Sequence, residues 1–263
     1  MGGDSKFLGL WFVAPYIIGL ALFTAFPFVA SFYLSFTDYD LLSSPEWVGT
    51  KNYEKLFTRD RTFDKSLSVT LTYVAMTVPL KLIFALFIAV VLNYRLRGIN
   101  LFRTAYYVPS ILGGSIAIAV LWRYMFANTG LVNMVLTGLG FEAVNWFGDP
   151  DNALITLTLL RCWQFGSAMV IFLAALQSVD RSLYEAAAID GANPWHIFRY
   201  ITLPLITPVI FFNLIMQTVQ AFQEFNGPYI ITQGGPLKST YLLPLYIYDE
   251  AFRRFDMGYA SAI

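Results

Sequence analysis

The sequence predicts an all-α membrane protein, a polytopic helical bundle with five complete spans and the start of a sixth. Two observations support this class. Apolar residues make up 57% of the 263 residues and charged residues only 13%, so the chain is more hydrophobic than a soluble domain. The apolar residues also form continuous stretches that reach the roughly 20 residues a helix needs to cross a bilayer. Barrel strands would be shorter and would alternate polar with apolar residues, so helices are expected.

The first predicted span runs from Leu8 to Phe36. It is longer than the apolar core of a signal peptide and lacks a small-residue cleavage site, so we expect it to be retained. Pro15 and Pro27 are expected to bend it. Residues 1–65 would hold this span and an outer loop, and residues 66–263 the core of one continuous membrane domain.

The other complete spans are predicted at Leu67 to Leu92, Ala105 to Phe126, Ala153 to Leu176 and Leu205 to Phe225. The last residues, from Gly258 to Ile263, are small or apolar and are typical of the start of a sixth span. Residues after Ile263 are therefore expected to complete it.

A polar loop, residues 178–204, separates the fourth and fifth spans. Ser182 with Glu185 three positions later forms a capping box, which predicts the start of a helix. Gly191 can adopt the left-handed conformation that ends one. One short helix is therefore expected before a sharp turn.

A second short helix is predicted within the same loop. Asn193 offers an N-cap and Pro194 a first-turn proline, so a helix from Trp195 to Ile201 should follow before Pro204 opens the fifth span. The loop would then be a rigid helix-turn-helix whose small alanines let a partner approach closely. The alternative is an ordinary solvated connector.

The residues give little support for catalysis. Cys162 is the only cysteine and lies in a span, where packing is its expected role. His196 is the only histidine, so neither a metal centre nor a serine-histidine catalytic site has the residues it needs. No lysine follows a glycine, which excludes a phosphate-binding loop. No catalytic or metal-binding residue is predicted, and a net charge of zero argues against nucleic acid as a partner.

Basic residues give conflicting signals about orientation. Arg95, Arg97 and Arg103 lie in the short loop between the second and third spans, which favours a cytoplasmic position for that loop and for the 178–204 loop. The first loop also carries basic residues, namely Lys51, Lys55, Arg59, Arg61 and Lys65. We expect an inside amino terminus, because the longer first loop can translocate despite its charge.

Polar side chains inside the spans are costly in lipid and are expected to face a partner or water. In the fifth span Gln217, Gln220 and Glu224 recur at helical spacing on one face. In the fourth span Arg161 and Gln164 lie one turn apart, and Arg161 is expected at a depth similar to that of Gln217 in the fifth span. These two faces are predicted to line one cavity in the outer half of the membrane. The structural alternative is that Arg161 pairs with Glu224 or with a partner subunit, while the glutamines bond across helices.

Other amphipathic residues in the spans have simpler explanations. Lys81 in the second span and Arg123 near the end of the third are expected to snorkel or to bond between helices. Trp11, Trp122 and Tyr124 lie near span ends and are expected to be interfacial anchors.

The 178–204 loop resembles the signature loop of ABC importer permeases. The residues that carry this resemblance are Glu185-Ala-Ala, Asp190-Gly191-Ala192, Phe198, Ile201 and Leu203-Pro204. Shorter segments agree with it, namely Ser35-Phe-Thr-Asp38, Asn52-Tyr53, Leu96-Arg-Gly98, Phe102-Arg103, Gly234-Gly-Pro236 and Gly258-Tyr-Ala-Ser-Ala262. The whole chain looks like the maltose-type, binding-protein-dependent branch that takes up carbohydrates.

The resemblance implies that the loop docks on a cytoplasmic ATPase subunit. The matching residues are Glu185, Ala186, Ala187, Asp190, Gly191, Ala192, Phe198, Leu203 and Pro204. It also implies a homologous second permease subunit, two copies of the ATPase subunit and an extracytoplasmic solute-binding protein. ATP and Mg would bind the ATPase subunits, and no cofactor would bind this chain. The chain would lie among lipid in a bacterial or archaeal inner membrane, with its amino terminus and coupling loop in the cytoplasm.

The family's substrate contacts lie on the same two spans that carry the polar faces. The predicted pathway residues are therefore Arg161, Gln164, Gln217, Gln220 and Glu224, with Phe222, Phe225 or Trp163 stacking on the rings of an oligosaccharide. A buried arginine can hold a carboxylate through two parallel hydrogen bonds. This favours an acidic sugar, such as a uronate oligomer or alginate fragment, over a neutral one.

Two other functions stay open. A self-contained secondary transporter or channel could use Arg161 and Glu224 as coupling charges, which explains the buried charges but not the loop. A structural membrane scaffold explains the loop but not the glutamine face. Co-purification with an ATPase and a second permease would distinguish the importer from both.

Overall fold

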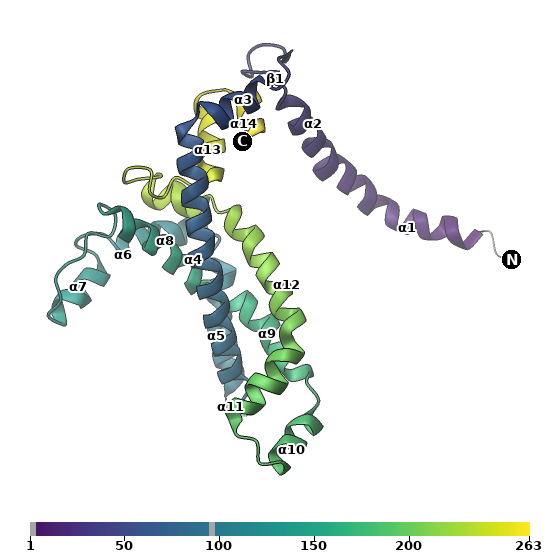
Figure 1. Cartoon of the computed structure of the whole chain (residues 1–263), viewed down its shortest axis with the longest axis vertical. Coiled ribbons are helices and arrows are strands. Elements are labelled where there is room, and N and C mark those ends of the chain that lie inside the picture. The colour runs from purple at the N-terminus through teal and green to yellow at the C-terminus, as the bar shows by residue number, and fades with distance from the viewer. Residues whose placement is uncertain (1–3, 95–97) are drawn as a thin grey trace. The chain divides into compact units, whose positions relative to one another are not determined.

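The computed structural model describes residues 4–94 and 98–263 (Figure 1). Arg95 and Arg97, on which the predicted orientation partly rests, lie outside these residues, as does Leu96. The chain divides into two compact units, residues 1–64 with 246–263 and residues 65–245. The carboxyl-terminal residues therefore belong to the same unit as the first helix. The functional division at residue 65 stays a prediction.

The first unit begins with one long helix. It consists of α1 (Asp4–Leu20), the π-helical turn η1 (Ala21–Ala25) and α2 (Phe26–Leu34). The helix continues through both Pro15 and Pro27, so neither proline ends it. The wider π turn precedes Pro27, so that the N–H of Phe26 reaches the carbonyl of Ala21.

Short elements complete this unit. They are the antiparallel strands β1 (Thr37–Asp38) and β2 (Glu46–Trp47), followed by α3 (Lys51–Thr58), η4 (Asp249–Arg253) and α14 (Met257–Ala262). Three of the family-like segments meet among them. The side-chain amide of Asn52 donates to the carbonyls of Ser35 and Thr37 (3.0 and 2.9 Å). Gly258 donates its N–H to the carbonyl of Tyr39 (3.1 Å), and a side chain at Gly258 would collide with Thr37. These segments therefore have a shared structural role.

The second unit holds a helix bundle. Its elements are most of α4 (Arg61–Leu92), then α5 (Ile99–Leu112), α6 (Ile116–Met125), α7 (Leu131–Gly138), α8 (Pro150–Trp163), α9 (Gly166–Ser178), α10 (Arg181–Ile189), α11 (Pro194–Ile197), η2 (Phe198–Thr202), α12 (Leu203–Phe222), η3 (Pro228–Thr232) and the start of α13 (Leu243–Tyr248). Helix α9 contacts both α5 and α12.

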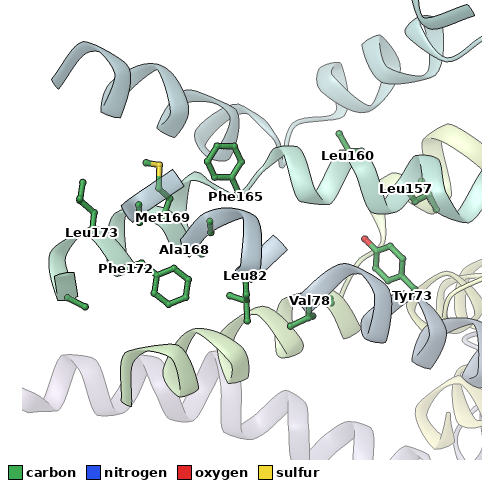
Figure 2. Close-up of a cluster of buried hydrophobic side chains, with 14 of the residues drawn as sticks. Tyr73, Val78, Leu82, Leu157, Leu160, Phe165, Ala168, Met169, Phe172 and Leu173 are labelled. Atoms are coloured by element: carbon green, nitrogen blue, oxygen red, sulfur yellow. The ribbon is translucent and has the colours of Figure 1, made fainter. Parts of the chain in front are cut away.

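The core of this unit joins α4, α8 and α9 (Figure 2), and Ile206 and Ala221 of α12 also belong to it. Ala85 and Ala89 on α4 and Ala168 on α9 are completely buried, and their small side chains allow close helix approach. Phe172 and Met169 fill the remaining space and are almost fully buried. Packing of this kind supports association in lipid, where the hydrophobic effect between helices is absent.

Three helices in the described part of the chain are long and apolar enough to cross a membrane: Trp11–Leu34, Arg61–Leu92 and Pro194–Phe222. Two bent pairs pass the same test. The pair α5 and α6 is bent by 101° and the pair α8 and α9 by 44°. The described chain therefore has three to five candidate spans, depending on whether each bent pair forms one span.

The predicted third and fourth spans are each interrupted by a helix break. Between α5 and α6 lie Gly113 and Gly114, which stabilise a helix poorly, and Ser115, whose hydroxyl caps α6 by accepting from the N–H of Ile118 (3.4 Å). Between α8 and α9, Gln164 ends the first helix, and its N–H bonds to the carbonyl of Arg161 (3.2 Å). Average hydrophobicity over these stretches conceals both breaks.

Candidate functional site

A polar cavity of about 240 Å³ lies in the second unit where the two helix breaks meet. Its wall comes from α4, α6, α8, the α5–α6 break and the end of α12 with the residues that follow. The polar residues on this wall are Tyr73, Ser115, Arg161, Gln164, Gln220, Gln223, Glu224 and Asn226. Irregular backbone at membrane depth is tolerated where protein or a water-filled cavity surrounds it. Broken helices also form the binding sites of many transporters.

Hydrogen bonds join the two breaks directly. The amide nitrogen of Gln164 donates to the carbonyl of Gly113 (2.9 Å). The hydroxyl of Ser110 donates to the carbonyl of Gln164 and accepts from the N–H of Ser167, both at 3.0 Å. Gly113 permits this approach, because any side chain there would overlap with that of Gln164. The cavity wall therefore depends on a glycine and a glutamine from different helix breaks.

The guanidinium of Arg161 is held by three acceptors. Its Nε lies 3.3 Å from Oε2 of Glu224, and the two side chains are only 19% and 13% exposed. Its Nη1 donates to Oε1 of Gln164 (3.0 Å) and its Nη2 to the carbonyl of Gln220 (3.3 Å). The structure thus contains the Arg161–Glu224 pair that the structural alternative predicts, and this pair lies on the cavity wall.

The predicted face of Gln217, Gln220 and Glu224 is not formed as expected. Helix α12 ends at Phe222, so Glu224 lies beyond it and helical spacing no longer applies. Its Oε1 accepts from the N–H of Gly227 (3.0 Å). Gln217 is 5% exposed and is not on the cavity wall; it belongs to the buried face of α12. Gln220 reaches the wall, and its carbonyl contacts Arg161.

The three aromatic residues expected to stack on sugar rings lie in different places. Phe225 is on the cavity wall, where its ring stacks on that of Tyr229 with 5.0 Å between centroids. Phe222 and Trp163 are not on this wall, and the ring of Trp163 instead contacts Trp122. Only Phe225 is therefore placed for such stacking in this conformation.

Sequence reasoning missed Tyr73, which is 1% exposed and lies on the cavity wall. Figure 2 shows it on α4 beside Leu157 of α8, another wall residue. Lys81, on the same helix, does not snorkel, because it is 3% exposed. Arg123 does bond between elements, since its Nη1 donates to the carbonyl of Ile230 (3.2 Å). The recurrence of polar residues at three- and four-residue spacing along the second span was the sequence signal that could have placed Tyr73 and Lys81 on a buried face.

The 178–204 loop is a second candidate site. The prediction that Ser182 caps its first helix is wrong, because Asp180 is the N-cap of α10 and accepts from the N–H of Ser182 (2.9 Å). Hydrogen bonds from Ser182 hold the pKa of the Asp180 carboxyl below its ordinary value. The turn at Gly191 is confirmed, with φ of 74°. The N–H groups of Gly191 and Ala192 return to the carbonyls of Ala188 and Ala187 (3.2 and 2.9 Å), which closes the helix end.

The second part of the loop differs from its prediction. Asn193 is indeed the N-cap of α11, and its Oδ1 accepts from the N–H of His196 (2.8 Å). The helix does not stop before Pro204, however. It continues through η2 into α12, so that residues Pro194–Phe222 form one helix. In the π turn the N–H of Leu203 bonds to the carbonyl of Phe198, and this shifted register accommodates the proline that follows.

The loop residues matched to the family differ in exposure. Glu185, Ala186, Asp190, Gly191 and Pro204 are exposed, Ala192, Phe198 and Leu203 are half-buried, and Ala187 is buried. Two large apolar side chains that sequence reasoning did not select are also exposed. Ile189 is 87% and Trp195 68% exposed. Such residues on a capped, rigid loop are suited to contact a partner.

No group of three or more histidine, cysteine, aspartate or glutamate side chains in the described residues could hold a metal ion. A polar cavity among broken helices in a membrane bundle is typical of membrane transport proteins. Residues 57–263 match the family described as "Binding-protein-dependent transport system inner membrane component", and the chain belongs to this family.

Two curated relatives agree with this assignment. The probable ABC transporter permease protein YesP of Bacillus subtilis (strain 168) is 50% identical over 258 residues, which cover 97% of this chain and 84% of YesP. The lactose transport system permease protein LacF of Rhizobium radiobacter is 36% identical over 263 residues, which cover 97% of this chain and 87% of LacF. The predicted family, a permease of the carbohydrate-uptake branch of binding-protein-dependent ABC transporters, is confirmed.

A solved structure has the same fold. It is the crystal structure of a bacterial ABC transporter involved in the import of the acidic polysaccharide alginate. The match has a TM-score of 0.82 at 23% identity and covers 98% of this chain and 89% of that one. The family match and the curated relatives make the chain a multi-pass inner-membrane permease of a sugar importer. Permeases of this family are not catalytic, which agrees with the prediction that the chain is not an enzyme.

Proposed function

We propose that this chain forms half of the translocation pathway for an oligosaccharide, with the polar cavity as part of that pathway. The observation that carries the proposal is the convergence of Arg161, Gln164 and Glu224 where two helix breaks meet. Buried charges are costly in lipid and are kept where a substrate or a partner uses them. A second, homologous permease subunit would supply the other half.

The 178–204 loop would couple this pathway to two copies of a cytoplasmic ATPase subunit. Caps at Asp180 and Asn193 and the closed turn at Gly191 make the loop stiff. Ile189 and Trp195 would enter a groove on the ATPase as apolar anchors. ATP and Mg would bind in the ATPase subunits, and an extracytoplasmic binding protein would deliver the sugar. The amino terminus and the loop would both be cytoplasmic.

The helix Pro194–Phe222 supports this coupling. It begins in the loop and ends two residues before Glu224, and its 29 residues extend over about 43 Å at the rise of an α-helix. One continuous helix therefore joins the two candidate sites. Movement of the loop on closure of the ATPase subunits would shift the carbonyl of Gln220 and the Glu224 segment against Arg161. This change would open or close the cavity as the transporter alternates between inward-facing and outward-facing states.

The substrate proposed is an acidic oligosaccharide of the uronate or alginate type. Arg161 supplies the cation on the cavity wall, and its present partner Glu224 is a carboxylate like the one a uronate would present. A sugar carboxylate would therefore replace Glu224 at the guanidinium. A neutral oligosaccharide is the second candidate, favoured by the full set of acceptors already around Arg161 and by the lactose relative.

Co-purification and ATPase measurements test this function. The chain should isolate an ATPase and a second permease, and the complex in lipid should hydrolyse ATP faster with its sugar-loaded binding protein. A chain that purifies alone and transports without ATP would overturn the importer proposal and support the self-contained transporter. Family membership favours the importer over that alternative and over a scaffold.

A further inference from the structure

Helix α4 carries a buried polar stripe that the cavity only partly uses. Its members are spaced three or four residues apart and are at most 3% exposed, namely Ser66, Thr70, Tyr73, Thr77 and Lys81. This spacing places them on one face of the helix. A polar face inside a membrane bundle is expected to have a partner for each member.

The stripe members on the amino-terminal side of Lys81 have clear roles. The hydroxyl of Ser66 donates to the carbonyl of Tyr241, and that of Thr70 accepts from the N–H of Leu243 (2.9 Å). Tyr73 lies on the cavity wall. Thr77 donates to the hydroxyl of Thr158 on α8 (3.3 Å), which directs this face toward the helix that carries Arg161.

Lys81 is different. Among the described residues it has no hydrogen bond and no carboxylate within ion-pair distance, although it is 3% exposed and central in its span. Lys81 lies one helical turn from Thr77, and the hydrogen-bond partner of Thr77, Thr158, lies about one turn from Arg161 on α8. Asn213 on α12 is fully buried, and neither of its side-chain polar atoms has a partner in the described chain. Unsatisfied polar groups of this kind are costly in a static core.

Two cations and one carboxylate therefore share this region, and Glu224 is the carboxylate. Glu224 lies in the irregular segment after α12, so it is less constrained than a residue within a helix. If it moved from Arg161 to Lys81, the carboxylate would stay paired and Arg161 would become available. A sugar carboxylate on Arg161 would then leave two cations and two carboxylates paired one to one. This balance avoids the high cost of an uncompensated buried charge.

We propose that Lys81 is a specificity-determining residue of the sugar pathway, which receives Glu224 when an anionic sugar engages Arg161. This inference rests on the proposed function. It adds a charged residue of α4 to a site whose charged residues, Arg161 and Glu224, come from α8 and from the segment after α12. It also gives a reason that acidic sugars are accepted, because one ion pair would be replaced by two.

The test replaces Lys81 in the assembled complex, with its second permease, ATPase subunits and binding protein in lipid. Lys81→Met keeps an unbranched apolar side chain and removes the charge. Stimulation of ATPase activity by binding protein loaded with alginate trisaccharide should fall at least about tenfold, the loss expected for one charge-assisted contact. The thermal midpoint of the complex should rise or stay unchanged, because an unpaired buried charge is removed. A residue needed only for packing would lower both.

Matched variants complete the experiment. Lys81→Arg keeps the charge and should retain most of the stimulation. Lys65→Met makes the same change at an exposed lysine of α4 and should alter neither readout. Lys81→Met combined with Glu224→Gln should lose much less than the sum of the single losses, because the two residues act as a pair.

Three results would overturn the inference. They are unchanged alginate stimulation in Lys81→Met, additive losses in the double variant, and stimulation of the wild-type complex by maltotriose but not by alginate trisaccharide. A wild-type complex that no sugar-loaded binding protein stimulates would instead refute the proposed function itself. The two failures are therefore distinguishable.

Discussion

The side-chain amide of Gln164 donates a hydrogen bond to the backbone carbonyl of Gly113 (2.9 Å), which links the end of α8 to the end of α5. The two residues are far apart in sequence, and each lies at a helix break. The contact exists only because Gly113 has no side chain. It places the polar atoms of Gln164 between Gly113 and Arg161, so the geometry of the cavity depends on it.

Gly113→Ala is expected to destabilise the permease by about 1–3 kcal/mol, because the added methyl group would overlap with Gln164 and force it away from both partners. The thermal midpoint of the purified complex measures this loss. Gly114→Ala is the matched control, since a side chain at the next residue meets no atom within 4 Å. Equal midpoints for the two variants would contradict the prediction.

Arg161→Gln is expected to reduce ATPase stimulation by alginate-loaded binding protein by about 10- to 100-fold, as a charged contact worth roughly 1.5–3 kcal/mol is lost. The reconstituted complex with its sugar-loaded binding protein provides the measurement. Maltotriose serves as the neutral comparison. The acidic-sugar proposal fails if alginate stimulation is unchanged in the variant.

Ile189→Ala is expected to weaken binding of the ATPase subunit by about tenfold or more, because a large apolar anchor in a docking loop typically contributes more than about 1 kcal/mol. Retention of the ATPase subunit on the detergent-purified permease during gel filtration measures this. Leu42→Ala removes a comparable side chain, 90% exposed but outside the loop, and should have no effect. Loss of the subunit in both variants, or in neither, would argue against docking at Ile189.

Asp60 gives the first unit a pH-dependent contact. One carboxylate oxygen accepts from the hydroxyls of Tyr246 and Tyr259, and the other from the N–H groups of Thr62 and Phe63 at the start of α4. Burial alone would raise the pKa of Asp60, but these hydrogen bonds outweigh it and hold the pKa below its ordinary value.

Asp60→Asn keeps an acceptor for the backbone N–H groups, yet its amide cannot accept from both hydroxyls. We expect a loss of about 1.5–3 kcal/mol at neutral pH. Because the folded pKa is below the unfolded value of about 3.9, the contribution of Asp60 is complete above that pH and is lost as the pH falls through the folded pKa. The thermal midpoints of the wild-type protein and of Asp60→Asn should therefore differ between neutral pH and about pH 4, and they should converge at lower pH. A difference that is constant with pH would contradict this origin.

Local features of the sequence predicted a large part of the molecule. Apolar stretches indicated the helical membrane class, and the left-handed turn at Gly191 and the cap at Asn193 were predicted from residues within one helical turn. The signature loop indicated the family, which the match over residues 57–263 confirms. Capping and turn formation depend on a few neighbouring residues, so a sequence pattern is enough to recognise them.

Only the tertiary structure determined where helices break, how long they continue and which polar groups meet. The spacing of Gln217, Gln220 and Glu224 assumed a helix that in fact ends at Phe222. The pairing of Arg161 with Glu224, the burial of Lys81 and the contacts of Asp60 with Tyr246 and Tyr259 join residues far apart in the chain. Their energies depend on distance and desolvation in three dimensions, and neither quantity is contained in the spacing of residues along a sequence.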